Sequence, residues 1–326
     1  MKVIRVIPAI IYSLILATIT SCGSGGGGTT ASGGMGGTGI SSGPITGFGS
    51  VFVNGVEFST TGTVINMNGA PSTEGDLRVG MIVTVQGTFD ANGSTGTANQ
   101  IDFTDNLEGP IQIINAGTQS LVVMGQTVKT DTGTHYEGIT GFNDLQHDNV
   151  IEVSGLPQSD GTVLATYIEL KSPNYNSGDE IEVKGVVSGL DPNSKTFKIG
   201  DLVVDYNSAS LENLPAGGLA DGIYVEVQST TGFDITGVFI ASKVEGLGSG
   251  ITGSEGTHVE LEGFVSQFNP TPPVGFVVNG QPVSITSSTH YENGTSTNLE
   301  NNVRVEVEGT LDANGVLIAS RISFDD

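Results

Sequence analysis

Apolar and polar positions alternate in the last part of the chain, residues 303–322. The alternation is clearest in one run of six residues: Val303, Arg304, Val305, Glu306, Val307 and Glu308. Side chains on a β-strand point to opposite faces in turn, so this run predicts a strand with one apolar and one charged face. Asp312-Ala313-Asn314-Gly315 then provides residues that accept the backbone of a tight turn, and residues 317–324 return as a second strand. The stretch predicts a β-hairpin.

The same hairpin pattern occurs three times earlier, in residues 81–101, 150–170 and 223–244. A leucine stands ten residues before the same position of each copy: Leu77, Leu145, Leu219 and Leu299 precede Gly87, Gly155, Ser229 and Gly309. We expect one short helical turn to end near each leucine, such as residues 295–301. Each return strand carries an alanine and, three residues later, an isoleucine or valine. A spacing of three does not keep both side chains on one face of a strand, which predicts a β-bulge or a strand that changes layer there.

A second landmark lies upstream of each hairpin, where a short apolar strand is interrupted by a glycine-containing turn. These turns are Asn54-Gly55, Met124-Gly125, Ile199-Gly200 and Asn279-Gly280. An Asn-Gly pair between apolar runs is a strong hairpin signal. The glycines are 70, 75 and 80 residues apart. Since solenoid repeats are usually about 20–50 residues long, this period indicates four small tandem domains.

The fold class expected from these patterns is all-β. The chain has 49 glycines and no tryptophan, and hardly any segment shows helical periodicity. A strand, a tight hairpin, a short helical turn and a long hairpin amount to about five strands per repeat. That order predicts a small, partly open Greek-key barrel of OB type, with a small β-sandwich as the alternative. The predicted repeats are residues 44–106, 107–172, 178–246 and 258–326.

The beginning of the chain predicts export and lipid attachment. Lys2 and Arg5 precede an apolar core in residues 6–19, as in a signal peptide, which we assign to residues 1–21. Ile19-Thr20-Ser21-Cys22 resembles the bacterial lipobox, and Cys22 is the only cysteine in the chain. We therefore expect lipidation at Cys22; an ordinary secretory signal is the alternative. Residues 22–43 are rich in glycine and serine and predict a flexible linker.

The net charge of −24 bears on the partners of the protein. Such a negative field repels nucleic acid, and we see no interleaving of basic and aromatic residues, so no nucleic-acid partner is expected. The acidic surface favours solubility and protects strand edges from pairing. Weak binding of divalent cations is the alternative explanation of the charge.

Two copies of Thr-His-Tyr-Glu provide the weak metal-ligand candidates of the sequence: His135, Glu137, His290 and Glu292. A metal site needs three or four convergent ligands, and Ile65 and Ser210 occupy the position of the histidine in the other repeats. We interpret each motif as a strand end that leads into a turn. Asp90-Ala91-Asn92-Gly93 likewise resembles the start of a calcium loop, but it lacks the later ligands and is interpreted as a turn.

No catalytic or cofactor constellation is evident. The chain lacks a Gly-x-Ser-x-Gly elbow on an α/β scaffold, and His147 and His258 lie in polar stretches. Paired carboxylates for glycoside hydrolysis depend on the fold, but Glu306 and Glu308 alternate on a predicted solvent face. We expect no enzyme activity and no cofactor. Copying one small barrel four times is a natural way to build a spacer or a multivalent binder.

A family resemblance agrees with this picture. Residues 45–56, ITGFGSVFVNGV, together with the hairpin from Leu77 and its alanine-containing return strand, resemble the proteobacterial lipoprotein family known only as domain of unknown function 5666. The resemblance implies tandem repeats and an envelope location, and no known activity. By resemblance to Gram-negative lipoproteins, Gly23 after the cysteine favours the outer membrane. The expected function is a non-enzymatic, lipid-anchored spacer or multivalent binding array of the bacterial envelope. The alternatives are a module that binds envelope polysaccharide, divalent cations or another envelope protein, and an enzyme that acts on envelope glycans.

Overall fold

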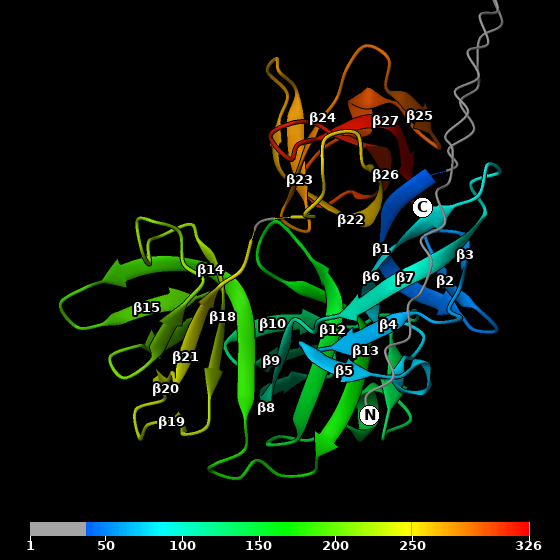
Figure 1. The fold of residues 1–326 in the computed structure, drawn as a ribbon. Helices are drawn as coiled ribbons and strands as arrows, with labels where there is room; N and C mark the ends of the chain where they lie inside the picture. Colours follow the sequence, from blue (N-terminus) through cyan, green and yellow to red (C-terminus); the bar gives the residue numbers. More distant parts are fainter. Residues whose placement is uncertain (1–36, 249, 326) are drawn as a thin grey trace, which may run out of the picture. The chain divides into compact units, whose positions relative to one another are not determined.

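The computed structural model describes residues 37–248 and 250–325, and these form an all-β protein of four tandem repeats. Repeat 1 lies at the blue end and repeat 4 at the red end of the colour scale in Figure 1. The predicted signal peptide, Cys22 and the first part of the predicted linker lie outside the described residues. Within those residues, no helix has the length and apolarity needed to cross a membrane.

The strands of the first two repeats follow the predicted order. Repeat 1 contains β1 (Gly37–Gly47), β2 (Val51–Val53), β3 (Val56–Ser59), β4 (Val64–Met67), β5 (Ala70–Ser72), β6 (Ile82–Phe89) and β7 (Thr95–Phe103). Repeat 2 contains β8 (Leu107–Asn115), β9 (Ser120–Val123), β10 (Gln126–Lys129), β11 (His135–Glu137), β12 (Val150–Pro157) and β13 (Val163–Ser172). Short 3₁₀-helices, η1 (Glu74–Asp76) and η2 (Phe142–Asp144), precede the long hairpins.

The last two repeats have the same strand order, but within the described residues repeat 3 lacks the 3₁₀-helix that the other three repeats have. Repeat 3 contains β14 (Ile181–Asp191), β15 (Thr196–Ile199), β16 (Leu202–Asp205), β17 (Ser210–Glu212), β18 (Tyr224–Ser229), β19 (Gly232–Phe233), β20 (Phe239–Ile240) and β21 (Lys243–Gly246). Repeat 4 contains β22 (His258–Asn269), β23 (Gly275–Val278), β24 (Gln281–Ser284), β25 (His290–Glu292), η3 (Ser296–Asn298), β26 (Arg304–Leu311) and β27 (Leu317–Phe324). Repeat 3 is irregular because its return strand is broken into two short pieces.

Each repeat closes into a barrel by the same set of strand pairings. In repeat 2, β8 pairs antiparallel with β9 and β12, β9 with β10, and β12 with β13. The circuit is completed by a parallel pairing of β10 with β13 that covers two residue pairs. The other three repeats show the equivalent parallel pairing. This five-stranded order is that of an OB-type barrel, and the narrow parallel contact leaves it partly open, as the sequence predicts.

The predicted tight turns are present, and so are three of the four predicted helical turns; in repeat 3, no helix precedes Leu219 within the described residues, and this leucine is only half-buried. Leu77, Leu145 and Leu299 are buried and directly follow η1, η2 and η3. The residues three positions later all have positive φ: Gly80, Asp148, Gly222 and Asn302. Asn54-Gly55 and Asn279-Gly280 form the tight turns with positive φ at both residues. In repeat 3 the turn is shifted by one residue from the predicted Ile199-Gly200, because Ile199 still belongs to β15 and is buried.

The predicted bulges are also present. The register of β7 against β6 shifts between Gln100 and Ala98, which leaves Asn99 unpaired. Equivalent shifts occur beside Ala165 and Ala319. In repeat 3 the chain leaves the strand at this point, since Ala241 lies in the gap between β20 and β21.

The end of the predicted linker requires correction, because residues 37–43 form the first half of β1. This segment pairs antiparallel with β6 on one edge, and residues 39–42 pair in parallel with β22 on the other. Its glycines indicate flexibility as long as the strands that pair with this segment are not known, so the sequence alone predicts a linker. Here Gly39 permits close approach: a Cβ at this position would lie 2.7 Å from the ring of Phe89 and 3.0 Å from the carbonyl oxygen of His258.

The first strands of the repeats join the barrels to each other. β1 pairs with β22, which links repeat 1 to repeat 4. β8 pairs antiparallel with β14 through residues 107–108 and 182–183, which links repeat 2 to repeat 3. Repeats 2 and 3 share one hydrophobic core, and Tyr167 of repeat 2 is buried in the core of repeat 1. The four barrels therefore contact one another directly.

The prediction that the polar face of β26 is exposed to solvent is also wrong. Glu306 and Glu308 are only partly exposed and stand directly opposite Glu262 and Glu260 of β22. His258, assigned to a polar stretch, is buried with its ring edge-on to Phe89 at 5.0 Å. Strand alternation distinguishes the two faces of a strand, but it cannot show which neighbouring strands and repeats cover the polar face.

Candidate functional site

Four glutamates form a row across neighbouring strands at the junction of repeats 2 and 3. Glu152 on β12 stands opposite Glu169 on β13 and opposite Glu108 on β8, and Glu108 stands opposite Glu182 on β14. Residues in register on neighbouring strands point to the same face of a sheet, and like charges placed directly opposite each other are destabilising. The negative charge of this row must therefore be balanced by cations or by protonation of some of the glutamates.

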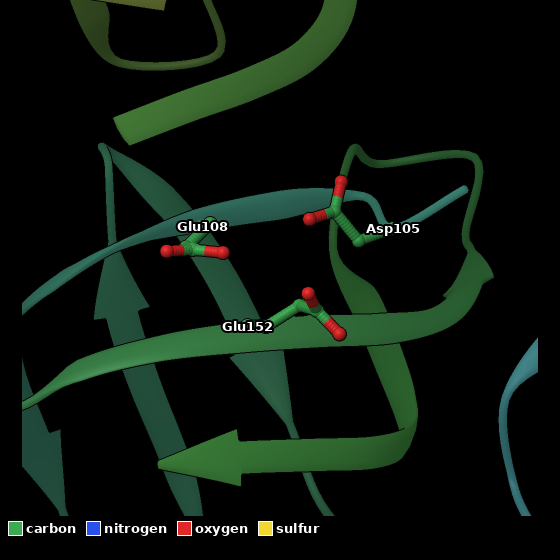
Figure 2. A group of neighbouring side chains, drawn as sticks. All are labelled: Asp105, Glu108 and Glu152. Carbon is green, nitrogen blue, oxygen red and sulfur yellow. The ribbon is translucent and has the colours of Figure 1, made fainter. Parts of the chain in front are cut away.

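Asp105 joins this row from the segment that connects repeat 1 to repeat 2. One side-chain oxygen from each of Asp105, Glu108 and Glu152 lies within 4.8 Å of the others. Figure 2 shows the three carboxyl groups gathered beside strands β8 and β12. Asp105 is 2% exposed and Glu152 is 3% exposed, whereas Glu108 is partly exposed. Within the described residues, this is the one group of three or more such donors with metal-ligand geometry.

Two lysines partly neutralise the cluster. The Lys184 Nζ, which is itself buried, lies 2.6 Å from Asp105 Oδ1, 2.7 Å from Glu182 Oε1 and 3.4 Å from Glu226 Oε2. The Lys171 Nζ lies 3.3 Å from Glu152 Oε2 and 3.9 Å from Glu108 Oε2. The salt bridges arise because β13 and β14 place these lysines beside the row. They leave several carboxylate oxygens without an ammonium partner.

The pKa values of the acids reflect burial and mutual repulsion. Burial raises the pKa of Glu108 to about 7, with Lys171 opposing and the charge of Glu152 adding to the shift. Burial also raises the pKa of Glu152, and it raises that of Asp105 well above its usual range although Lys184 opposes this. Burial disfavours charged Lys184, but Asp105, Glu182 and Glu226 together raise its pKa.

Asn68 brings repeat 1 into the same site. Its side-chain Nδ2 lies 3.4 Å from Asp105 Oδ2 and 3.5 Å from Glu152 Oε2, and its Oδ1 accepts a hydrogen bond from the Asp105 backbone N–H. Asn68 has a positive φ of 47° in the turn after β4, a conformation that asparagine tolerates. The site is thus built from repeats 1, 2 and 3 and from the connection between the first two.

The metal-ligand candidates from the sequence lie elsewhere and are paired with arginines. Glu137 Oε2 is 2.6 Å from Arg78 Nε and accepts a hydrogen bond from the Tyr167 hydroxyl. Glu292 Oε2 is 3.0 Å from Arg321 Nη1. The structure brings neither pair into a group of three donors among the described residues. Metal binding at these residues remains a prediction that their geometry does not favour.

The two histidines of these motifs are exposed. His135 borders a cavity of about 280 Å³ that Asp131 and Arg304 also line. The His290 side chain is 73% exposed, and its Nε2 is 4.0 Å from Glu292 Oε1. Both residues begin short strands that pair with the return strand, as expected for a strand end.

A shared hydrogen bond explains why the threonine of the Thr-His-Tyr-Glu motif recurs. The hydroxyls of Thr134 and Thr289 donate to the carbonyl oxygens of Ala165 and Ala319 at the bulges. In repeat 1 Thr63 makes the same bond to Ala98. Strand register then places Val64 at the position of the histidine, which corrects the earlier assignment of Ile65.

The sequence patterns do not single out Asp105, Glu108 or Glu152. Glu108 and Glu152 each lie between apolar residues, in Leu-Glu-Gly and Ile-Glu-Val, so alternation places them on polar faces. The available signal was that Glu152 and Glu182 occur in identical Ile-Glu-Val runs of successive repeats. Nothing in the sequence specifies the register that places β12, β8 and β14 side by side.

Comparison with known proteins gives one clear result. A family model described as "Domain of unknown function (DUF5666)" matches residues 40–102, 108–169, 176–245 and 262–323. None of the curated proteins matches the chain. Among solved structures, the chain is similar to one described as drosophila Unr CSD456, with 13% identity over 68% of this chain and 97% of that chain. The TM-score of that superposition is 0.17, so it supports no argument about fold or function.

Proposed function

The chain belongs to the DUF5666 family, with four tandem copies of its domain, and on this premise we propose that it is a non-enzymatic bacterial envelope protein. In this proposal Cys22 carries a lipid anchor, and the four barrels serve as a spacer or as a multivalent binding array. The proposed source is proteobacterial, and the outer membrane is the proposed location because Gly23 follows the cysteine.

The observation that carries the proposal is the way in which the copies are joined. β1 pairs with β22, β8 pairs with β14, and repeats 2 and 3 share a core. In these contacts, strand edges and core residues of one repeat bind those of another and hold the repeats together. Repeated domains joined in this way favour a structural or multivalent role, since a single active site does not need four copies.

The anchor is tested by replacing Cys22 with alanine in the producing bacterium. We expect Cys22→Ala to leave the protein uncleaved or unanchored, because Cys22 is the only cysteine in the chain and the acyl chains have no other attachment point. Ser21→Ala is the matched control: it keeps a small residue before the cysteine and should stay in the membrane fraction. Normal cleavage of Cys22→Ala, shown by its mass, together with membrane retention equal to that of the unmodified chain would contradict the proposal.

A spacer and a binding array differ in their response to envelope glycans. Thermal unfolding in the presence of a panel of envelope polysaccharides distinguishes them. A rise in Tm with one polysaccharide favours the binding array, and an unchanged Tm across the panel favours the spacer.

A further inference from the structure

The distances in the junction cluster suit a single bound cation. Calcium binds six to eight oxygen ligands at about 2.3–2.6 Å, so two oxygens on opposite sides of one ion are about 5 Å apart. The donor oxygens of Asp105, Glu108 and Glu152 all lie within 4.8 Å of one another. They come from three separate segments: the connection between repeats 1 and 2, β8, and β12. One ion can therefore contact all three.

A buried oxygen of Glu152 provides a second, independent observation. The Glu152 side chain is 3% exposed, and its Oε2 already interacts with Lys171. Its Oε1 is buried and has no hydrogen-bond partner among the described residues. A buried carboxylate oxygen without a partner lowers the stability of the folded chain, and a bound cation at this oxygen would remove that cost.

The lysines do not balance the charge of the junction. The salt-bridged network contains three lysines: Lys171, Lys184 and Lys243. It contains seven acids: Asp105, Glu108, Glu152, Glu169, Glu182, Glu226 and Glu245. A divalent cation has the sign of charge that offsets this excess, and it would offset two of the four surplus negative charges. Lys184 would keep Glu182 and Glu226 as partners if Asp105 turned to the ion.

We propose that Asp105, Glu108 and Glu152 bind one divalent cation of the calcium type at the junction of repeats 1, 2 and 3. Oxygen donors alone favour a hard cation, and calcium tolerates irregular oxygen geometry better than magnesium, which loses its water reluctantly. The ion ties the connection between repeats 1 and 2 to β8 and β12, beside the pairing of β8 with β14. This site does not depend on the lipid anchor, so either proposal can fail without the other.

Calorimetric titration of the full chain, purified in detergent and treated with chelator, tests the site. We expect one calcium ion to bind per chain. At calcium concentrations about a hundredfold above the dissociation constant, Tm rises by about 5 °C. Potassium chloride of equal ionic strength should not reproduce this rise, because screening does not depend on a specific site.

Two isosteric variants locate the ion. Glu152→Gln and Glu108→Gln each remove one charge with little change in shape, and each should weaken calcium binding at least tenfold. Circular dichroism shows whether each variant is folded, and two variants keep the test decisive if one does not fold. Glu306→Gln is the matched control in repeat 4, because it makes the same charge change at another half-buried glutamate and should bind calcium as the unmodified chain does.

Three results would overturn the proposal: no calcium heat and no rise in Tm, an equal rise in potassium chloride, or unchanged binding by both folded junction variants.

Discussion

At the scale of single residues, Glu306 shows how burial beside a neighbouring strand of the same repeat alters the pKa of a carboxyl group. It stands opposite Glu262 on β22, and its Oε1 lies 3.2 Å from Arg321 Nη2. Burial raises the pKa of Glu306 from 4.5 to about 7, with Arg321 opposing the shift. The folded chain therefore keeps a proton that the unfolded chain releases. It follows that stability is highest below about pH 4.5 for this group and falls as the pH rises towards 7.

The variant Glu306→Gln tests the direction of this change in stability with pH. Between pH 5 and pH 8 the unmodified chain should lose about 2 kcal/mol more stability than Glu306→Gln, because the variant has no proton to release at this position. Urea unfolding at several pH values measures the difference. Glu57→Gln, at an exposed position of β3, is the control for the change in net charge, and it should keep the pH dependence of the unmodified chain. Parallel pH profiles for the chain and Glu306→Gln would contradict this account.

At the scale of elements, the long hairpin depends on a glycine opposite its bulge. A Cβ on Gly87, Gly155 or Gly309 would lie 2.2–2.3 Å from a carbonyl oxygen of the return strand. Repeat 3 has Ser229 instead, and there the return strand is interrupted. The Ser229 hydroxyl donates to the carbonyl oxygen of Ile240 at 2.5 Å. The exception thus supports the rule that an intact bulge requires glycine.

Gly309→Ala should destabilise repeat 4. Its new Cβ would meet the Ile318 carbonyl oxygen, and relief of that clash by moving the backbone should cost about 2 kcal/mol. The fall in Tm on thermal unfolding measures this cost. Gly117→Ala is the matched control, because a Cβ there meets nothing within 4 Å and should leave Tm nearly unchanged. A similar Tm for both variants would show that the close contact is not real.

Local chemistry explains which elements the sequence predicted. Alternating valines, Asn-Gly turns and the alanine spacing specify strands, turns and bulges through side chains within about 20 residues of each other. The first half of β1 gave no such signal, because its pairing is made by backbone groups and Gly39 presents no side chain to alternate. Similarly, Glu108 and Glu152 were recognisable as residues on polar faces, but their meeting depends on strand register across the barrel.

At the scale of the whole chain, the repeats are joined by strand edges that an isolated OB barrel leaves free. β1 and β22 share one edge, β8 and β14 share another, and the carboxylate cluster lies beside the second. Covering these edges removes sites at which other chains could pair. The sequence showed four copies, but the contacts between them are long-range and differ from copy to copy. Their partners could not be predicted from a pattern that repeats.

Hydrogen exchange of residues 39–42 is the most direct test of whether the first strands join repeats 1 and 4. The amides of a flexible linker exchange much faster than those of a strand that is paired on both edges. Mass spectrometry of the full chain should find these amides protected nearly as well as the amides of β6, with exchange several orders of magnitude slower than in an unstructured peptide. Exchange of residues 39–42 at the rate of an unstructured peptide would show that repeats 1 and 4 are not joined by their first strands.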